Sequence, residues 1–173
     1  SLLLFIAIIG FGQTASTEVK LTGTLINPQS NELVIYKFDK SFEITIPVER
    51  NGNFSAKFKI NEPGFYFIKQ EKAYTNIFLR NGYNLKLNLD TKSFPNSIQY
   101  EGEGAVFNNY MKTKSALNLK LVGDAKVFFV VPIEDFIKKI AADSTEFFDQ
   151  LRTAKLSKED EQLARKLIHY DYL

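Results

Sequence analysis

The residues that could carry chemistry are few and widely separated in this chain of 173 residues. His169 is the only histidine, and the sequence contains no cysteine. A lone imidazole can complete neither a catalytic triad nor a zinc site. The lack of cysteine also excludes thiol nucleophiles, disulfides and thiolate metal ligands within these residues. We therefore predict no catalytic residue, no metal site and no cofactor here, and leave open whether a longer parent protein is an enzyme.

Two carboxylates and two glycines lie together near the middle of the chain. Glu101 and Glu103 flank Gly102, and paired carboxylates catalyse proton transfer only where a cleft perturbs their pKa values. Their position in a loop instead favours two exposed charges. Gly102 and Gly104 follow a strand pattern and precede a helical one, but the third glycine and the βαβ unit of a phosphate-binding loop are missing.

Tyrosines form the one candidate ligand surface that the sequence offers. Aromatic rings provide stacking platforms for sugars, although the lack of tryptophan weakens this hypothesis. The alternative is that the rings pack in the core. The candidate surface consists of Tyr36, Tyr66, Tyr74 and Tyr83, and Tyr100 is a further tyrosine that could line it.

The elements that would position these rings are strands, most clearly between Phe42 and Asp90. Apolar and polar residues alternate along Phe42–Val48 and again along Phe54–Ile60, which puts the apolar side chains on one face of each strand. Asn51-Gly52 between these two runs predicts a hairpin with a primed turn, and Asn81-Gly82 predicts a second hairpin. The strand from Phe65 to Lys69 differs because it carries aromatic residues on both faces.

The fold class follows from the repetition of such strands. Strand patterns with turn signals at intervals of about ten residues are typical of a sandwich or a partly open barrel. We predict an antiparallel β-sandwich of about seven to nine strands over residues 17–101. Gly23, inside the first of these strands, predicts a bulge or a close backbone approach.

The pattern becomes helical after Gly104, which makes the fold α+β. Apolar residues then recur at spacings of three and four. Pro132 suits a first helical turn, and Ser157 begins a motif close to a capping box. We predict a helical arm or linker of about three helices over residues 104–173. It has no terminal cap signal, so we expect it to be truncated at its end.

The N-terminus resembles an export signal. An apolar run of about ten residues, too short to span a bilayer, precedes small residues suited to a signal peptidase. We predict a signal peptide over residues 1–15, truncated at its start, and hence a periplasmic or secreted protein; a buried N-terminal strand or helix is the alternative. No cysteine follows the run to carry a lipid anchor. The net charge of +2 gives no footprint for nucleic acid.

Several segments together resemble a known family. They are TGTLIN at Thr22–Asn27, NGNFSAKFKINEPGFYFI at Asn51–Ile68, IFLRNGYNLKLNLD at Ile77–Asp90 and IQYEGEGAVFNNYM at Ile98–Met111. This combination resembles the N-terminal β-sandwich domain, with its helical linker, of secreted TlpA/ResA-like thiol–disulfide oxidoreductases. In that family a thioredoxin domain with a Cys-x-x-Cys motif follows and performs the redox chemistry. This chain has no such motif, so no catalytic residue carries over.

The resemblance implies a non-catalytic accessory domain that serves positioning, dimerisation or client recognition. The expected partner is another protein or a thioredoxin domain beyond Leu173. The alternative, suggested by the tyrosines, is a free-standing secreted binding module for a glycan or a peptide. The sequence leaves the oligomeric state and the ligand open.

Overall fold

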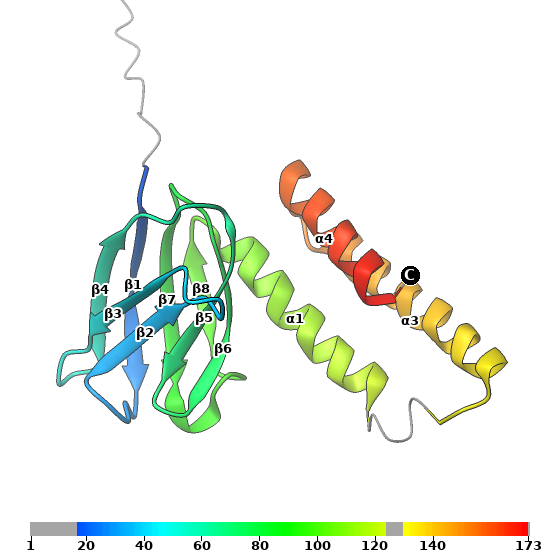
Figure 1. Cartoon of the computed structure of the whole chain (residues 1–173), viewed down its shortest axis with the longest axis horizontal. Coiled ribbons are helices and arrows are strands. Elements are labelled where there is room, and N and C mark those ends of the chain that lie inside the picture. Colours follow the sequence, from blue (N-terminus) through cyan, green and yellow to red (C-terminus); the bar gives the residue numbers. More distant parts are fainter. Residues whose placement is uncertain (1–16, 124–129, 173) are drawn as a thin grey trace, which may run out of the picture.

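The structure, a computed structural model, describes residues 17–123 and 130–172. The signal peptide predicted over residues 1–15 lies outside the described residues. Two four-stranded sheets stack into a sandwich, and three helices follow, so the α+β class is confirmed (Figure 1). The strands are β1 (Val19–Ile26), β2 (Glu32–Tyr36), β3 (Glu43–Pro47), β4 (Asn53–Phe58), β5 (Gly64–Gln70), β6 (Ala73–Leu79), β7 (Asn84–Asp90) and β8 (Gln99–Gly102). The helices are α1 (Ala105–Val122), α3 (Ile133–Thr153) and α4 (Lys158–Tyr172), and a 3₁₀ turn covers Thr91–Ser93.

The two sheets have different strand orders. The first sheet runs β4-β1-β7-β8 and the second β3-β2-β5-β6. All neighbours are antiparallel except β1 and β7, which are parallel. This pair departs from the purely antiparallel sandwich that we expected. The chain reaches β7 from the second sheet rather than through a hairpin, so β7 is not obliged to run opposite to β1.

The two predicted hairpins are wrong, because both Asn-Gly turns carry the chain from one sheet to the other. β3 lies in the second sheet and β4 in the first. Across the turn between them the structure has an isolated bridge between Val48 and Phe54 and a bond of 2.8 Å from the N–H of Glu49 to the carbonyl of Asn53. Gly52 donates its N–H to the carbonyl of Glu49 at 2.8 Å. Only Gly52 has a positive φ, of 84°, whereas a primed turn needs one at Asn51 too. Asn-Gly signals a chain reversal, but it does not specify which sheet receives the next strand.

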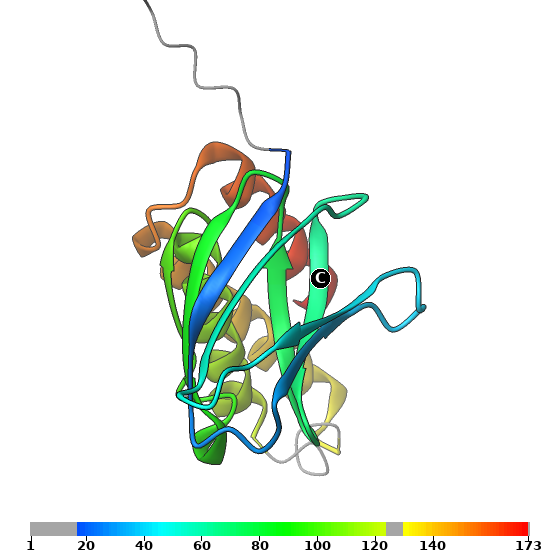
Figure 2. The ribbon, with the colours of Figure 1, turned by 90° about the vertical axis from the view of Figure 1, so that its left-hand side faces the viewer.

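The predicted alternation of apolar and polar faces is confirmed. Along β1 the side chains of Val19, Leu21 and Leu25 are buried between the sheets, while the residues between them are at least partly exposed. Gly23 is the predicted close approach: a Cβ there would lie 1.7 Å from the carbonyl oxygen of Leu87 on the parallel neighbour. The core is therefore assembled from the inner faces of both sheets. Figure 2 views the strands of the sandwich with the helices behind them.

Helix α1 packs along the sandwich, and α3 and α4 pair with each other on the side of α1 that faces away from the sandwich (Figure 1). Phe107 on α1 contacts Phe78 on β6, with ring centroids 4.8 Å apart. Lys114, buried on α1, forms an ion pair of 2.5 Å with Asp171 on α4. The N-terminus of α4 is capped as predicted, because the N–H of Asp160 donates to Oγ of Ser157 at 3.1 Å. No helix among the described residues has the length and apolar character needed to cross a membrane.

Candidate functional site

The candidate tyrosines point in two different directions. Tyr66 and Tyr83 are buried, with exposed fractions of 1% and 9%. The hydroxyl of Tyr66 donates to the carbonyl of Glu62 at 2.9 Å. Tyr36 and Tyr74 instead lie on the outward face of the second sheet, and only these two are presented together to solvent. Whether any of the four binds a ligand stays a prediction.

The buried tyrosines carry the electrostatic signature of core residues. Burial, followed by the nearby carboxylate of Asp160, raises the pKa of Tyr83 to about 12. Burial likewise raises the pKa of Tyr100, whose side chain is also inside the molecule. The guanidinium of Arg80 lies 5.8 Å from the ring centroid of Tyr83 and forms ion pairs with Glu159 and Asp160. These contacts fasten the start of α4 to the sandwich beside the buried ring of Tyr83.

An exposed group of rings lies on the outer face of the second sheet, and we name it the outer aromatic cluster. Its members come from β2, β5, β6 and the turn after β2: they are Tyr36, Phe38, Phe67 and Tyr74. Strand register explains the grouping, since Tyr36 on β2 lies directly opposite Phe67 on β5. Phe38, beyond the end of β2, folds back onto Phe67 with a centroid distance of 4.2 Å.

Most ring contacts of the outer aromatic cluster are edge to face, and Tyr36 and Phe67 are the pair with a smaller interplanar angle, of 31°. Phe38 meets Phe67 at an interplanar angle of 65°, and Tyr74 meets Phe67 at 64°. The two outer rings remain open to solvent, with Phe38 69% and Tyr74 55% exposed. The cluster is therefore an uneven apolar surface with protruding ring edges, and not a flat platform.

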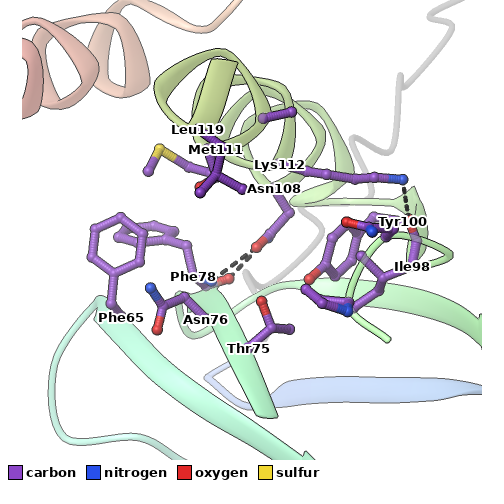
Figure 3. Close-up of a pocket in the computed structure, with 14 residues that line it drawn as sticks. Phe65, Thr75, Asn76, Phe78, Ile98, Tyr100, Asn108, Met111, Lys112 and Leu119 are labelled. Atoms are coloured by element: carbon purple, nitrogen blue, oxygen red, sulfur yellow. Dashed lines mark hydrogen bonds between the residues drawn. The ribbon is translucent and has the colours of Figure 1, made fainter. Parts of the chain in front are cut away.

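A groove lies beside this cluster, between β6, α1 and the loop before β8 (Figure 3). Its volume is about 280 Å³. We name it the edge groove, and its lining includes Asn76, Ile98, Met111, Lys112, Ala116 and Leu119. Lys112 is its one charged lining residue, and its ammonium donates to the carbonyl of Ile98 at 2.6 Å.

Asn108 closes one end of the edge groove by imitating a neighbouring strand. Its side-chain oxygen accepts the N–H of Phe78 at 2.8 Å, and its side-chain nitrogen donates to the carbonyl of Phe78 at 2.9 Å (Figure 3). The same nitrogen donates to the carbonyl of Gly104 at 3.0 Å. Asn108 is buried, so these bonds satisfy a strand edge that water reaches poorly.

The remaining chemical candidates from the sequence are not brought together. Glu101 forms an ion pair of 3.2 Å with Lys86, and Glu103 is exposed. His169 is exposed on α4, and its ring lies 6.0 Å from that of Tyr170. Within residues 17–123 and 130–172, no three histidine, aspartate or glutamate side chains gather in a way that could hold a metal ion.

Comparison with known proteins gives little further information. No protein-family model matches the sequence, and no curated protein matches it. Among solved structures, the chain is similar to a DUF3823 family protein from Bacteroides ovatus, with 16% identity over 42% of this chain and 43% of that one and a TM-score of 0.33. A DUF3823 family protein from Parabacteroides merdae matches with 17% identity over 44% of each chain and a TM-score of 0.28.

Each match spans less than half of the solved chain, and similarity at this level carries no functional argument. The comparisons do not link the chain to TlpA/ResA-like proteins, so that kinship stays a prediction.

Sequence reasoning missed Phe38 and Phe67 as members of a surface site. Phe67 gave a usable signal, because β5 carries aromatic residues on both of its faces. A strand with only one face on the core needs apolar residues on that face alone. Phe38 gave no comparable signal, since it lies past the end of β2 and its position depends on the turn.

Proposed function

We propose that this chain is a non-catalytic accessory module that recognises a polypeptide partner through the outer aromatic cluster, as part of an extracytoplasmic thioredoxin-like protein of the TlpA/ResA type. The observation that carries the proposal is the exposure of Phe38 and Tyr74 beside the half-buried ring of Phe67. Exposed apolar patches on folded proteins mark interaction sites, and aromatic residues are prominent among those that dominate binding energy.

The geometry of the rings favours a polypeptide over a glycan. A sugar ring stacks on the flat face of an aromatic residue, whereas the rings of Phe38 and Tyr74 meet Phe67 at steep angles. Protruding ring edges instead suit insertion among the side chains of another protein, where each aromatic residue buries roughly 150–250 Å². The secreted glycan-binding module is therefore the weaker candidate, and the peptide-binding form of that alternative is compatible with the same cluster.

Photo-cross-linking from the position of Phe38 tests the recognition role. A photoreactive phenylalanine analogue replaces Phe38 in the full-length protein, and a matched analogue replaces Lys86, which is exposed on the outer face of the first sheet. We expect cross-linked polypeptide from Phe38 and not from Lys86. Equal yields from both positions would contradict a role for the cluster.

Phe38→Ser provides the loss-of-binding variant. The side chain is largely exposed, so we expect the free energy of unfolding to change by less than about 1 kcal/mol. For this variant the photoreactive analogue replaces Tyr74 instead of Phe38. Cross-linking from this position should occur in the otherwise wild-type protein and disappear with Phe38→Ser, while the circular dichroism stays unchanged.

The link to thioredoxin-like proteins has a separate test. It rests on the resemblance of the sandwich and linker sequences and on the signal-like start. Determining the coding sequence beyond Leu173 should reveal a thioredoxin domain with a Cys-x-x-Cys motif, and fractionation should find the protein outside the cytoplasm. A stop codon or an unrelated domain after Leu173 would remove the oxidoreductase link without affecting the role of the aromatic cluster.

A further inference from the structure

The edge of β6 beside the groove has main-chain groups that point outward. β6 is the last strand of the second sheet, with β5 as its one strand neighbour among the described residues. In an antiparallel pair, successive residues direct their N–H and C=O groups alternately toward and away from the neighbour. The N–H and the C=O of Phe78 both bond to the side chain of Asn108, so these main-chain groups point away from β5. The main-chain groups of Asn76 and Tyr74, two and four residues earlier, must point away from β5 as well.

The edge groove lies directly alongside these groups. Asn76 and Thr75 of β6 line one wall, and Met111 and Leu119 of α1 line another (Figure 3). At about 280 Å³ the groove is at or below the lower limit of the roughly 300–1,000 Å³ that small-molecule sites occupy. It is the right scale for a side chain whose main chain runs outside the groove along β6.

Charge complementarity indicates which kind of segment fits. Lys112 is the one charged residue in the lining, and no carboxylate lines the groove among the described residues. Its ammonium has three N–H donors, of which the carbonyl of Ile98 takes one. The remaining donors favour an anionic group at the mouth of the groove, such as an acidic side chain or a terminal carboxylate.

We propose that an extended segment of a partner polypeptide adds to the edge of β6 as a further strand. It forms main-chain hydrogen bonds with Asn76 and Tyr74, places an apolar side chain in the edge groove and pairs a carboxylate with Lys112. Strand addition of this kind obtains affinity from the main chain and specificity from pockets for alternate side chains. The inference deepens the proposed function, on which it rests for the class of partner, and it adds the main-chain edge of β6 and the edge groove to the outer aromatic cluster, with which it shares Tyr74.

Amide hydrogen exchange of the free protein tests the open edge. The N–H groups of Thr75 and Ile77 point toward β5, so they should exchange slowly, while the N–H of Asn76 should exchange quickly. Slow exchange at Asn76 in the free protein would overturn the proposal, because the edge would then already be paired.

Selection from a random peptide library displayed on phage identifies the probe for binding. We expect enriched peptides that combine a large apolar residue with a nearby acidic residue, and protection of the Asn76 amide when a synthetic copy binds. Methylation of the peptide's main-chain nitrogens should weaken binding at least about tenfold, or about 1.4 kcal/mol. Failure to enrich any peptide would overturn the inference.

Two matched variants locate the bound peptide. Ala116→Trp fills the groove from an exposed position of α1 and should also weaken binding at least about tenfold. Thr113→Trp adds the same side chain one turn away, outside the groove lining, and should leave the affinity unchanged. Binding that survives Ala116→Trp but disappears in Phe38→Ser would overturn the groove inference and still support the outer aromatic cluster.

Discussion

The two sheets of the sandwich have similar inner faces and very different outer faces. On the first sheet, the outward side chains of β1, β4 and β7 are mostly polar or charged, among them Lys20, Thr22, Thr24, Lys57, Lys86 and Asn88. Ile26, at the end of β1 and 56% exposed, is the apolar exception. On the second sheet, the corresponding face carries Val34 and the outer aromatic cluster. Both sheets bury aliphatic residues on their inner faces, so the difference does not arise from the core.

This contrast separates what the fold needs from what a partner could use. The first sheet is assembled with a polar outer face, so an aromatic outer face is not a requirement of this architecture. Cross-strand aromatic pairs do stabilise a sheet, by roughly 0.2–1 kcal/mol each, and the facing rings of Tyr36 and Phe67 fit that role. Phe38 does not, because it lies beyond the strand and is 69% exposed.

The largest effect is expected inside the first sheet, at Gly23. Gly23→Val would drive a side chain into the carbonyl of Leu87, 1.7 Å from the position of a Cβ, where the neighbouring backbone cannot move freely. We expect a loss of about 3 kcal/mol or more in the free energy of unfolding, measured by urea denaturation. Thr22→Val, on the outer face of the same strand, should change it by less than about 0.5 kcal/mol. Similar losses in both variants would mean that β1 is no more closely packed at Gly23 than on its outer face.

A smaller effect is expected on the second sheet, at Asn108. Asn108→Leu would leave the N–H and C=O of Phe78 without their partners in a buried place, which costs about 2–3 kcal/mol in urea denaturation. Asn109→Ala is the matched control, since this exposed neighbour makes one bond, to the carbonyl of Tyr100 at 3.0 Å. If the two variants were equally stable, the bonds from Asn108 to Phe78 would not stabilise the edge of β6. The paired edge at Phe78 would then not differ in stability from the open edge at Asn76.

The sequence predicts the layers of this molecule better than their connections. Alternation along β1 and along the run from Phe42 to Val48 identifies the inner face, because burial acts on every second side chain. The change to helices after Gly104 and the cap at Ser157 follow from equally local signals. The strand order could not be predicted, since an Asn-Gly turn reverses the chain identically within one sheet and between two.

The candidate site was predictable only in part, for a related reason. The tyrosine pattern contains Tyr36 and Tyr74, but it cannot separate them from Tyr66, which is buried one residue away from Phe67 on the opposite face of β5. The edge groove depends on where α1 lies against β6. That position is set by contacts between distant residues, such as the packing of Phe107 on Phe78, which no local pattern contains.

The smallest effect is expected for the buried tyrosines at alkaline pH, and it distinguishes the interior from the outer faces. The pKa of Tyr83 is raised by burial to about 12, whereas an unfolded tyrosine titrates near pH 10. The unfolded chain therefore loses this proton first. The stabilisation is complete below about pH 10 and falls as the pH rises towards 12.

Urea denaturation at a series of pH values between these limits should show a shallower decline for Tyr83→Phe than for the wild type. Some decline should remain, because burial also raises the pKa of Tyr110 to about 12. Phe38→Ser alters the outer aromatic cluster and no titratable group, so it should keep the wild-type slope. If the decline of stability with pH were the same in Tyr83→Phe as in the wild type, the ring of Tyr83 would not be shielded from water by α4 and Arg80.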